Sequence, residues 1–201
     1  MQIVQITELD KKRIRIFLED GRNFVLYKGE GRRFCLKEGE ELSEEQYGEI
    51  RSEILIKRAR SRTMHLLEKM DRTEFQLRTK LRQGYYDEDI IDDAIAYVKG
   101  FHYLDDARFA QNYVRCQKEK KSRRKIQIEL LQKGIGKELI EQALAEEYQQ
   151  ENEQEQIRRW IEKKHYSGKT ADLKEKQKMY QFLMRKGFRS DDILHVLDYL
   201  T

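Results

Sequence analysis

Apolar residues recur at two different spacings along this chain, and the change of spacing divides it into two parts. Up to about residue 40 they lie in short runs typical of strands, and an Asp-Gly turn joins the runs 14–18 and 23–27. From Ser43 onwards they recur every three or four residues, as in amphipathic helices. The pattern predicts a small β-element of three or four strands followed by a mainly α chain.

The predicted β-element is a hairpin or meander built around the Asp-Gly turn. Segments 3–6 and 33–36 have strand-like composition and are expected to flank the hairpin, while Gly29-Glu30-Gly31 is expected to form a hairpin turn. An element of this size is too small to be stable alone. We therefore expect it to pack against the first helices.

Three glycines mark a repeat in the helical part of the chain. Gly84, Gly134 and Gly187 each follow a large apolar residue by three positions and directly precede another. Each glycine is expected to end a helix in the left-handed conformation, where a side chain would clash with the backbone. A period of roughly 50 residues predicts a tandem repeat of three three-helix units that stack into an elongated array.

The repeat sets the predicted boundaries and helix starts. We expect a β-element over 1–42 and helical units over 43–104, 105–150 and 151–201. Ser43 begins a capping box that opens a long helix towards residue 70, and Thr73 and Asp87 begin the next two helices. The apolar positions expected to face inward include Phe75, Leu77, Tyr97, Ile128, Leu131, Leu183, Met184, Leu194 and Leu200.

Charged residues are dense and unevenly distributed. They make up 39% of the 201 residues against 38% apolar residues, and the net charge is +4. Basic residues crowd 57–82, 118–125 and 158–189, with acidic stretches between them. If equivalent helices line up, one face becomes cationic and suits a polyanion or the acidic face of a protein polymer. The alternative, that these helix faces are only solvated, stays open.

No set of residues has the spacing of a catalytic or metal site. Asp105 and Asp106 are adjacent at a predicted helix start, where capping explains them better than acid–base chemistry. The four histidines lack zinc spacing, and Cys35 and Cys116 are expected to act as small apolar residues in a reducing compartment. We expect no catalytic residues, no cofactor and no metal, and therefore a protein that is not an enzyme.

Two further patterns resemble functional motifs, but simpler interpretations are favoured for both. Residues 167–170 resemble the end of a phosphate-binding loop, but Lys163 stands where that motif needs a glycine, so a connection between helices is expected. Tyr103, Phe109 and Tyr113 alternate with basic residues, and core packing is favoured over base stacking. The chain shows no signal segment and no run of eighteen apolar residues, so we expect a cytoplasmic location without membrane contact.

The stretch Tyr103-Leu104-Asp105-Asp106-Ala107-Arg108-Phe109-Ala110, with Lys133-Gly134-Ile135 downstream, resembles the RecX family of recombination regulators. The resemblance is strong over 66–144 and looser elsewhere, and Thr73, His102 and Ser122 depart from the usual family residues. The signature positions, to which we assign structural roles, are Tyr103, Leu104, Asp105, Asp106, Arg108, Phe109, Ala110, Gly134 and Ile135.

The resemblance implies a non-enzymatic regulator that binds the RecA filament. Such a protein lodges in the filament groove and restrains the ATPase, strand-exchange and co-protease activities of RecA in recombinational repair and the SOS response. Some members also bind DNA, so the expected partners of a monomeric chain are the RecA filament and single- or double-stranded DNA. The alternative is a sequence-nonspecific DNA-binding protein that acts independently of RecA. The contact candidates, chosen from charge alone, are Arg78, Arg82, Arg115, Lys121, Arg123, Arg124, Lys125, Lys133 and Lys186.

Overall fold

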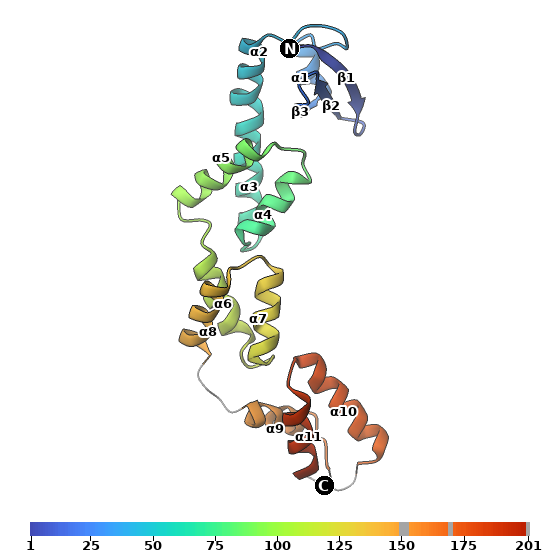
Figure 1. Ribbon diagram of the computed structural model, residues 1–201, viewed down its shortest axis with the longest axis vertical. Helices are drawn as coiled ribbons and strands as arrows, with labels where there is room; N and C mark the ends of the chain where they lie inside the picture. Colours follow the sequence, from blue (N-terminus) through green and yellow to red (C-terminus); the bar gives the residue numbers. More distant parts are fainter. Residues whose placement is uncertain (149–152, 169–170, 200–201) are drawn as a thin grey trace. The chain divides into compact units, whose positions relative to one another are not determined.

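The computed structural model describes residues 1–148, 153–168 and 171–199, and the chain divides into two compact units, Met1–Leu104 and Asp105–Thr201 (Figure 1). Helices dominate both units, and the only sheet in the described part of the chain lies at its amino-terminal end. The predicted mainly α class with a small β-element is therefore confirmed.

The amino-terminal sheet is an antiparallel meander of three strands in the order β1 (Ile3–Glu8), β2 (Arg13–Leu18) and β3 (Asn23–Tyr27). In the hairpin Ile16 pairs with Phe24, and both side chains are buried. Gly21 supplies the left-handed backbone that the Asp-Gly turn requires, with φ of 87°. The hairpin expected from the alternating pattern is confirmed.

Two expectations for the segment after the hairpin are wrong. Residues 29–31 lie in helix α1 (Lys28–Arg33), not in a turn, and 33–36 form the helix end and a turn, not a strand. The Glu30 carboxylate accepts a hydrogen bond from the Tyr27 amide at 2.8 Å, which stabilises the helix start. Gly31 serves close packing, because a Cβ there would lie 2.7 Å from Ile14 Cδ1.

One long helix follows, as the sequence predicts for 44–70, but its middle is widened. It runs through α2 (Glu44–Glu49), the π-helix η1 (Ile50–Ile56) and α3 (Lys57–Lys69). The Ser43 capping box is present, with the Gln46 amide donating to Ser43 Oγ at 3.1 Å. The longer hydrogen-bonded turn of a π-helix fits Ile50 and Leu55, five residues apart, which are both buried in the same core.

Two shorter helices, α4 (Glu74–Arg82) and α5 (Glu88–Gly100), complete the first unit. One continuous apolar core joins the sheet to these helices and includes Phe24, Ile50, Leu77 and Ile91. The β-element thus packs on the first helices, which supplies the apolar partner that three strands alone lack.

The second unit contains two groups of three helices with separate cores. Counting the helices of the first unit as the first helix group, the second helix group is α6 (Asp106–Gln117), α7 (Arg123–Gln132) and α8 (Lys137–Glu147). The third helix group is α9 (Glu153–Lys163), α10 (Leu173–Lys186) and α11 (Ser190–Tyr199). Asp105 caps α6 by accepting a hydrogen bond from the Arg108 amide at 2.9 Å, so the capping interpretation of this carboxylate is confirmed.

Two of the three repeated glycines are left-handed as predicted, and one is not. Gly134 and Gly187 have φ of 82° and 94°, whereas in the first copy the left-handed residue is Tyr85, with φ of 63°. A Cβ on Gly84 would lie 3.0 Å from the Tyr86 ring, so this glycine provides space for a side chain. His102 is also left-handed, with φ of 57°, a conformation that glycine adopts more readily.

Several positions predicted to be inward-facing are exposed. In the helices that carry these positions, the buried stripe is narrower than the apolar pattern, because the helices of the same core cover only one side of each. Both cysteines are also exposed, which corrects the expected small apolar roles. Leu200, Lys169 and Thr170 lie outside the described residues. The exposed apolar positions among those predicted as inward-facing are Phe75, Tyr97, Ile128, Leu131, Met184 and Leu194.

The aromatic residues near the signature stretch divide between core and surface. Phe109 and Tyr113 are half-buried against the core of their helix group, as predicted, whereas Tyr103 is 52% exposed and stacks on Phe101.

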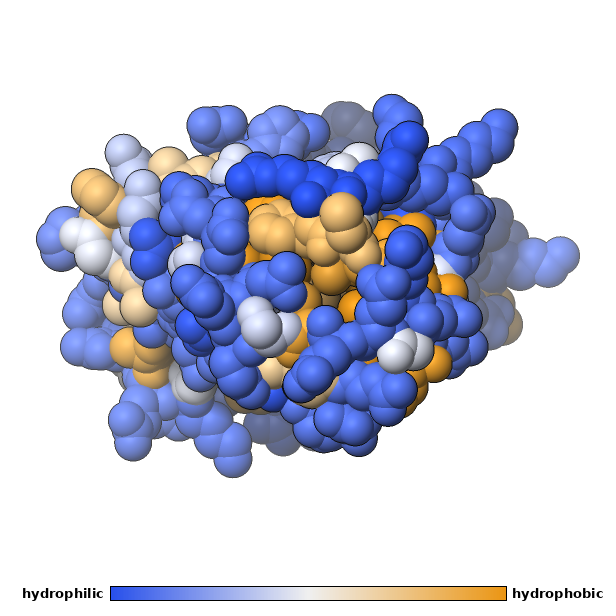
Figure 2. Space-filling model, turned by 90° about the horizontal axis from the view of Figure 1, so that it is seen from above, coloured by the Kyte–Doolittle hydropathy of each residue, from blue (hydrophilic) through white to orange (hydrophobic). Residues whose placement is uncertain are grey.

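Over the face seen in Figure 2, hydrophilic residues surround the places where apolar residues reach the surface. In the part of the chain that the structure describes, no helix has the length and apolar character needed to cross a membrane.

Candidate interaction surface

In the first unit, the two predicted contact residues are held by carboxylates of the protein itself. Arg78 pairs with Glu74 and Asp92, each at 2.7 Å, and Arg82 pairs with Glu88 at 2.6 Å. The pairs join α4 to the start of α5, so these arginines cross-link two helices. A partner would have to compete with these carboxylates for the guanidinium groups.

Two more candidates form ion pairs in the second unit. Arg115 pairs with Glu147, and Lys121 pairs with Glu129 at 2.7 Å. Glu129 also accepts a hydrogen bond from the Tyr113 hydroxyl at 2.6 Å. Burial alone would raise the pKa of Glu129, but the hydrogen bonds from Lys121 and Tyr113 hold that pKa below its usual value. Burial, and then the contact with Glu129, raises the pKa of Tyr113.

The basic segment 123–125 forms the first turn of α7. Ser122 caps this helix, because its hydroxyl accepts a hydrogen bond from the Lys125 amide at 3.2 Å. The side chains of Arg123 and Arg124 are exposed, and that of Lys125 is half-buried. Cations are unfavourable at a helix amino terminus, where the helix dipole is positive. The side chains in the first turn of α7 are all cationic, and Glu153, which the Arg123 backbone contacts, is an anion of the protein itself at this helix start.

This segment lies against the end of α10 in the same unit. The Ser122 amide donates a hydrogen bond to the Lys186 carbonyl at 3.1 Å. Gly187 packs so closely that a Cβ there would lie 2.4 Å from Lys125 Cβ. Glu153 is also near, since the backbone of Arg123 hydrogen-bonds to it, although burial and then Asp192 raise the pKa of Glu153 on balance. The structure thus brings residues 121–125 and 186 together from two helix groups.

Lys186 lies over two aromatic rings in a set of lysines. Its Nζ is 4.3 Å from the centre of the Trp160 ring and 5.4 Å from that of Phe182. Lys163 lies 5.2 Å from Trp160, and Lys164 lies 5.1 Å from Phe182. These cation–π contacts hold three ammonium groups on one side of the third helix group.

The charges of these lysines act on one another. The pKa of Lys186 is lowered, first by burial and then by the neighbouring ammonium groups. Because like charges repel, a bound anion would relieve this repulsion and restore the usual pKa. We call this set the lysine cluster, and it consists of Lys120, Lys121, Lys163, Lys164 and Lys186.

Sequence reasoning found part of this surface and missed the rest. It chose Lys121 and Lys186 but not Lys120, Lys163 or Lys164. A signal was present, because residues 163 and 164 follow Trp160 by three and four positions and so share a helix face with it. Lys133, another candidate, lies 5.3 Å from the Tyr113 ring. All nine charge-based candidates remain predictions.

Within 1–148, 153–168 and 171–199, no group of three or more His, Cys, Asp or Glu residues could hold a metal ion.

Three family models match the helical part of the chain in order. They are the first three-helix domain of RecX over residues 59–98, the second over 105–144 and the third over 151–197. The second and third matches correspond to α6–α8 and α9–α11, whereas the first begins within α3 and extends through α4 into α5, so that the amino-terminal sheet, α2 and η1 precede it.

Relatives and solved structures agree with these matches. A regulatory protein RecX of Clostridium botulinum is 31% identical over 96% of this chain and 92% of its own length. A second, from Caldanaerobacter subterraneus, is 34% identical over 81% of each chain. A crystal structure of regulatory protein RecX matches with a TM-score of 0.60 at 28% identity over 98% of both chains. RecX from Lactobacillus salivarius matches with a TM-score of 0.58 at 27% identity, over 73% of this chain and 96% of its own. The chain belongs to the RecX family of regulatory proteins.

Proposed function

We propose that this protein binds the RecA filament and restrains its ATPase, strand-exchange and co-protease activities. The observation that carries the proposal is the match of three RecX domains, in order, over 59–197. The relatives are named regulatory proteins, which favours action by binding over catalysis. On this proposal the protein works as a monomer in the cytoplasm during recombinational repair and the SOS response.

The lysine cluster and the first turn of α7 supply a surface suited to such binding. Lys186 is in a partly dehydrated position among like charges. Arg123 and Arg124 add exposed charge beside it. A surface of this kind attracts an acidic protein face over several ångströms. The attraction becomes stronger when the carboxylates of that face replace the water around the lysines. We therefore place the contact with the filament at these residues.

The test is the rate of ATP hydrolysis by RecA on single-stranded DNA, titrated with the protein at substoichiometric ratios. Inhibition is expected, because one regulator lodged in the filament groove would act on several neighbouring RecA protomers. The double variant Arg123→Glu, Arg124→Glu should need about tenfold more protein for the same inhibition, since charge reversal at an interface costs more than one hydrogen bond.

The matched control changes the same amount of charge at equivalent helix positions elsewhere in the second unit. Lys137 and Lys174 are exposed in the first turns of α8 and α10, and neither belongs to the lysine cluster. The variant Lys137→Glu, Lys174→Glu should inhibit as the unmodified protein does. Equal loss in both variants would show that net charge matters and that the chosen surface does not.

A second candidate function is DNA binding that does not involve RecA. The observation that favours it is the position of Trp160, the only tryptophan, among the lysines, because a ring between cations can stack on a base. Affinity for a single strand would then fall steeply with salt, and binding would change the tryptophan fluorescence. DNA binding without any inhibition of RecA would refute the first function and support this one.

A further inference from the structure

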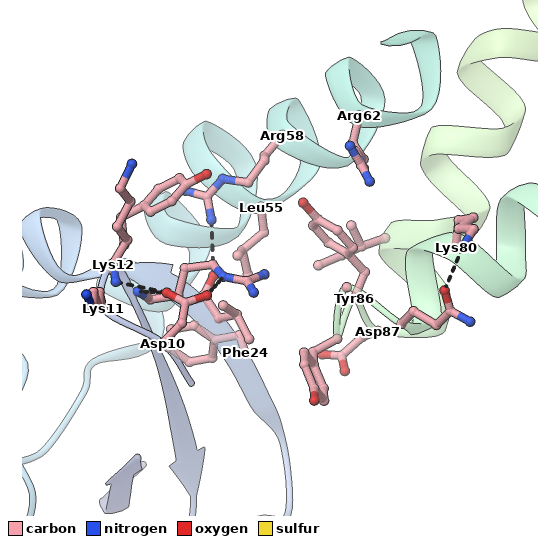
Figure 3. A pocket seen from close by; sticks show the side chains of 17 residues that line it. Asp10, Lys11, Lys12, Phe24, Leu55, Arg58, Arg62, Lys80, Tyr86 and Asp87 are labelled. Carbon is pink, nitrogen blue, oxygen red and sulfur yellow. Dashed lines mark hydrogen bonds and ion pairs between the residues drawn. The ribbon is translucent and has the colours of Figure 1, made fainter. Parts of the chain in front are cut away.

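A cleft of about 830 Å³ opens in the first unit between the β1–β2 turn, the helix α3 and the α4–α5 turn (Figure 3). Phe24 and Leu55 form part of its apolar wall. A volume of this size is in the range of small-molecule sites, roughly 300 to 1,000 Å³. All residues that line the cleft belong to the first unit, whereas the lysine cluster belongs to the second.

The cleft carries more positive than negative charge. Arg58 is already engaged, because it donates hydrogen bonds to Glu30 at 2.6 Å and to the Val25 carbonyl at 3.2 Å. Arg13 pairs with Asp10. The side chains of Lys11, Lys12 and Arg62 make no ion pair or hydrogen bond with any residue that the structure describes. The charged residues that line the cleft are the cations Lys11, Lys12, Arg13, Arg58, Arg62 and Lys80 and the carboxylates Asp10 and Asp87.

The α4–α5 turn is shaped to place an aromatic ring in this cleft. Figure 3 shows Tyr86 projecting from the turn towards Arg62, across from the lysines of the β1–β2 turn. Burial raises the pKa of Tyr86, while the positive charges of Arg58 and Arg62 oppose that rise. Gly84 gives the ring its space, and Tyr85 takes up a left-handed backbone of φ 63°. Such strain is typical of functional sites.

One half-buried carboxylate of the cleft, that of Asp87, has no hydrogen-bond donor among the residues that the structure describes. Asp87 precedes α5 but its side chain does not cap the helix, and the Ile90 amide donates to Asp89 Oδ1 at 2.8 Å instead. Among the described residues none donates a hydrogen bond to the half-buried Asp87 carboxylate. Burial, and then the charge of Asp89, raises the pKa of Asp87. A ligand that donates hydrogen bonds would meet this need.

We propose that this cleft binds a nucleotide. Its phosphates accept hydrogen bonds from Arg62 and from Lys11 and Lys12, and its ribose hydroxyls or base amino group donate to Asp87. Tyr27 lines the cleft and is 46% exposed; Arg58 covers one face of its ring, 4.7 Å from the ring centre, so the base would stack on the opposite face. A simple anion would leave Asp87 without donors, and a cation would be repelled by the lysines. A nucleotide is a ligand class that carries acceptors, donors and a ring together.

The same chemistry is present in a free nucleotide and in one nucleotide of a single strand. The test is calorimetric titration of the full chain, without RecA, with ADP, with inorganic pyrophosphate and with a 5′-phosphorylated single-stranded oligonucleotide. ADP or the oligonucleotide is expected to bind, and Arg62→Gln should weaken that binding about tenfold. Lys69→Gln is the matched control, because Lys69 is exposed on the same helix and does not line the cleft. Binding should be unchanged in this variant.

Each ligand and variant decides a separate point. ADP binding that depends on Arg62 identifies a free nucleotide as the ligand, and oligonucleotide binding alone with the same dependence identifies a nucleotide within a strand. Oligonucleotide binding that ignores Arg62→Gln belongs to another surface and counts against the cleft. Pyrophosphate binding as tight as that of ADP, or no binding of either nucleotide ligand, would overturn the proposal.

Asp87→Asn tests the proposed hydrogen bonds from the ligand to the Asp87 carboxylate. Asparagine begins a helix as well as aspartate does, so the fold should be kept, and circular dichroism verifies this. Nucleotide affinity should fall several-fold, because an amide oxygen accepts hydrogen bonds from ribose less strongly than a carboxylate. A gain in affinity would mean that Asp87 only repels the phosphates, which contradicts its proposed role. Because no RecA is present, failure here leaves the proposed regulation of RecA untouched.

Discussion

Replacement of Gly187 by alanine should destabilise the contact between the second and third helix groups. Gly187 has φ of 94°, where an L-residue costs about 1–2 kcal/mol. The new Cβ would also lie 2.7 Å from Ser122 Oγ and 3.3 Å from Lys125 Cα, and the latter belongs to the backbone and cannot rotate away. Relief requires α7 to move from α10.

That movement would break a buried hydrogen bond. The Ser122 amide donates to the Lys186 carbonyl at 3.1 Å, and Ser122 has no exposed surface. Leaving such a group without a partner costs about 1–3 kcal/mol. Together with the backbone strain, we expect a loss of about 2–4 kcal/mol in the free energy of unfolding, allowing for partial relaxation.

The assay is urea unfolding followed by the fluorescence of Trp160, the only tryptophan, which packs against the core of the third helix group. Gly187→Asn separates the two causes, because asparagine tolerates the left-handed conformation but still introduces a Cβ. Gly21→Ala is the control for φ alone, since Gly21 has φ of 87° and open space around it. If Gly187→Asn is as stable as the unmodified protein, the argument from the close contact is refuted.

Three further predictions concern caps, charge and packing. Thr73→Ala should cost about 1 kcal/mol, because it removes the hydroxyl that caps α4, and Thr73→Ser should restore the stability measured by circular dichroism. The lowered pKa of Glu129 gives stability that is complete above its unfolded pKa of 4.5 and is lost as pH falls through the lower folded value. Glu129→Gln should therefore flatten the acid limb of a stability–pH curve, and an unchanged limb would contradict the cause assigned to that pKa. Leu183→Ala should cost about 2–5 kcal/mol and the neighbouring Met184→Ala under about 1 kcal/mol, because only the first is buried; equal losses in Trp160-detected unfolding would contradict this.

Local chemistry made the helix starts and the hairpin predictable. Ser43, Thr73 and Asp105 cap their helices through their own side chains, and such a signal does not depend on distant residues. The turn at Gly21 is similarly local. The resemblance to a known family added the three-domain plan, which the spacing of the glycines alone only suggested.

Predictions failed where a distant residue decides the outcome. Gly31 was expected in a hairpin turn and Gly84 in the left-handed conformation, but both instead provide space, for Ile14 and for Tyr86. Phe75 has the helical spacing of a core residue but is half exposed, because burial depends on which helices pack beside a position and not on spacing alone.

The same limit applies to the interaction surface. Arg82 pairs with Glu88 and Arg78 with Asp92, carboxylates of the following helix, so that only the pair of Arg78 with Glu74 is local to α4. Lys120 and Lys164 join the lysine cluster because their charges act on Lys186, which belongs to another helix. Charge along a sequence therefore overestimates the cations that a partner can reach in α4 and underestimates those gathered around α10.

The three apolar cores described above have a consequence for synthesis of the chain. Each core is assembled from residues that are near one another in sequence, from Ile3 to Leu104, from Ala110 to Tyr148 and from Ile157 to Leu197. Contacts of short sequence separation form quickly, and domains fold as units while the ribosome still extends the chain. Each helix group can therefore bury its apolar residues soon after it leaves the exit tunnel, before the next group exists, which shortens the time in which nascent apolar surface is open to aggregation.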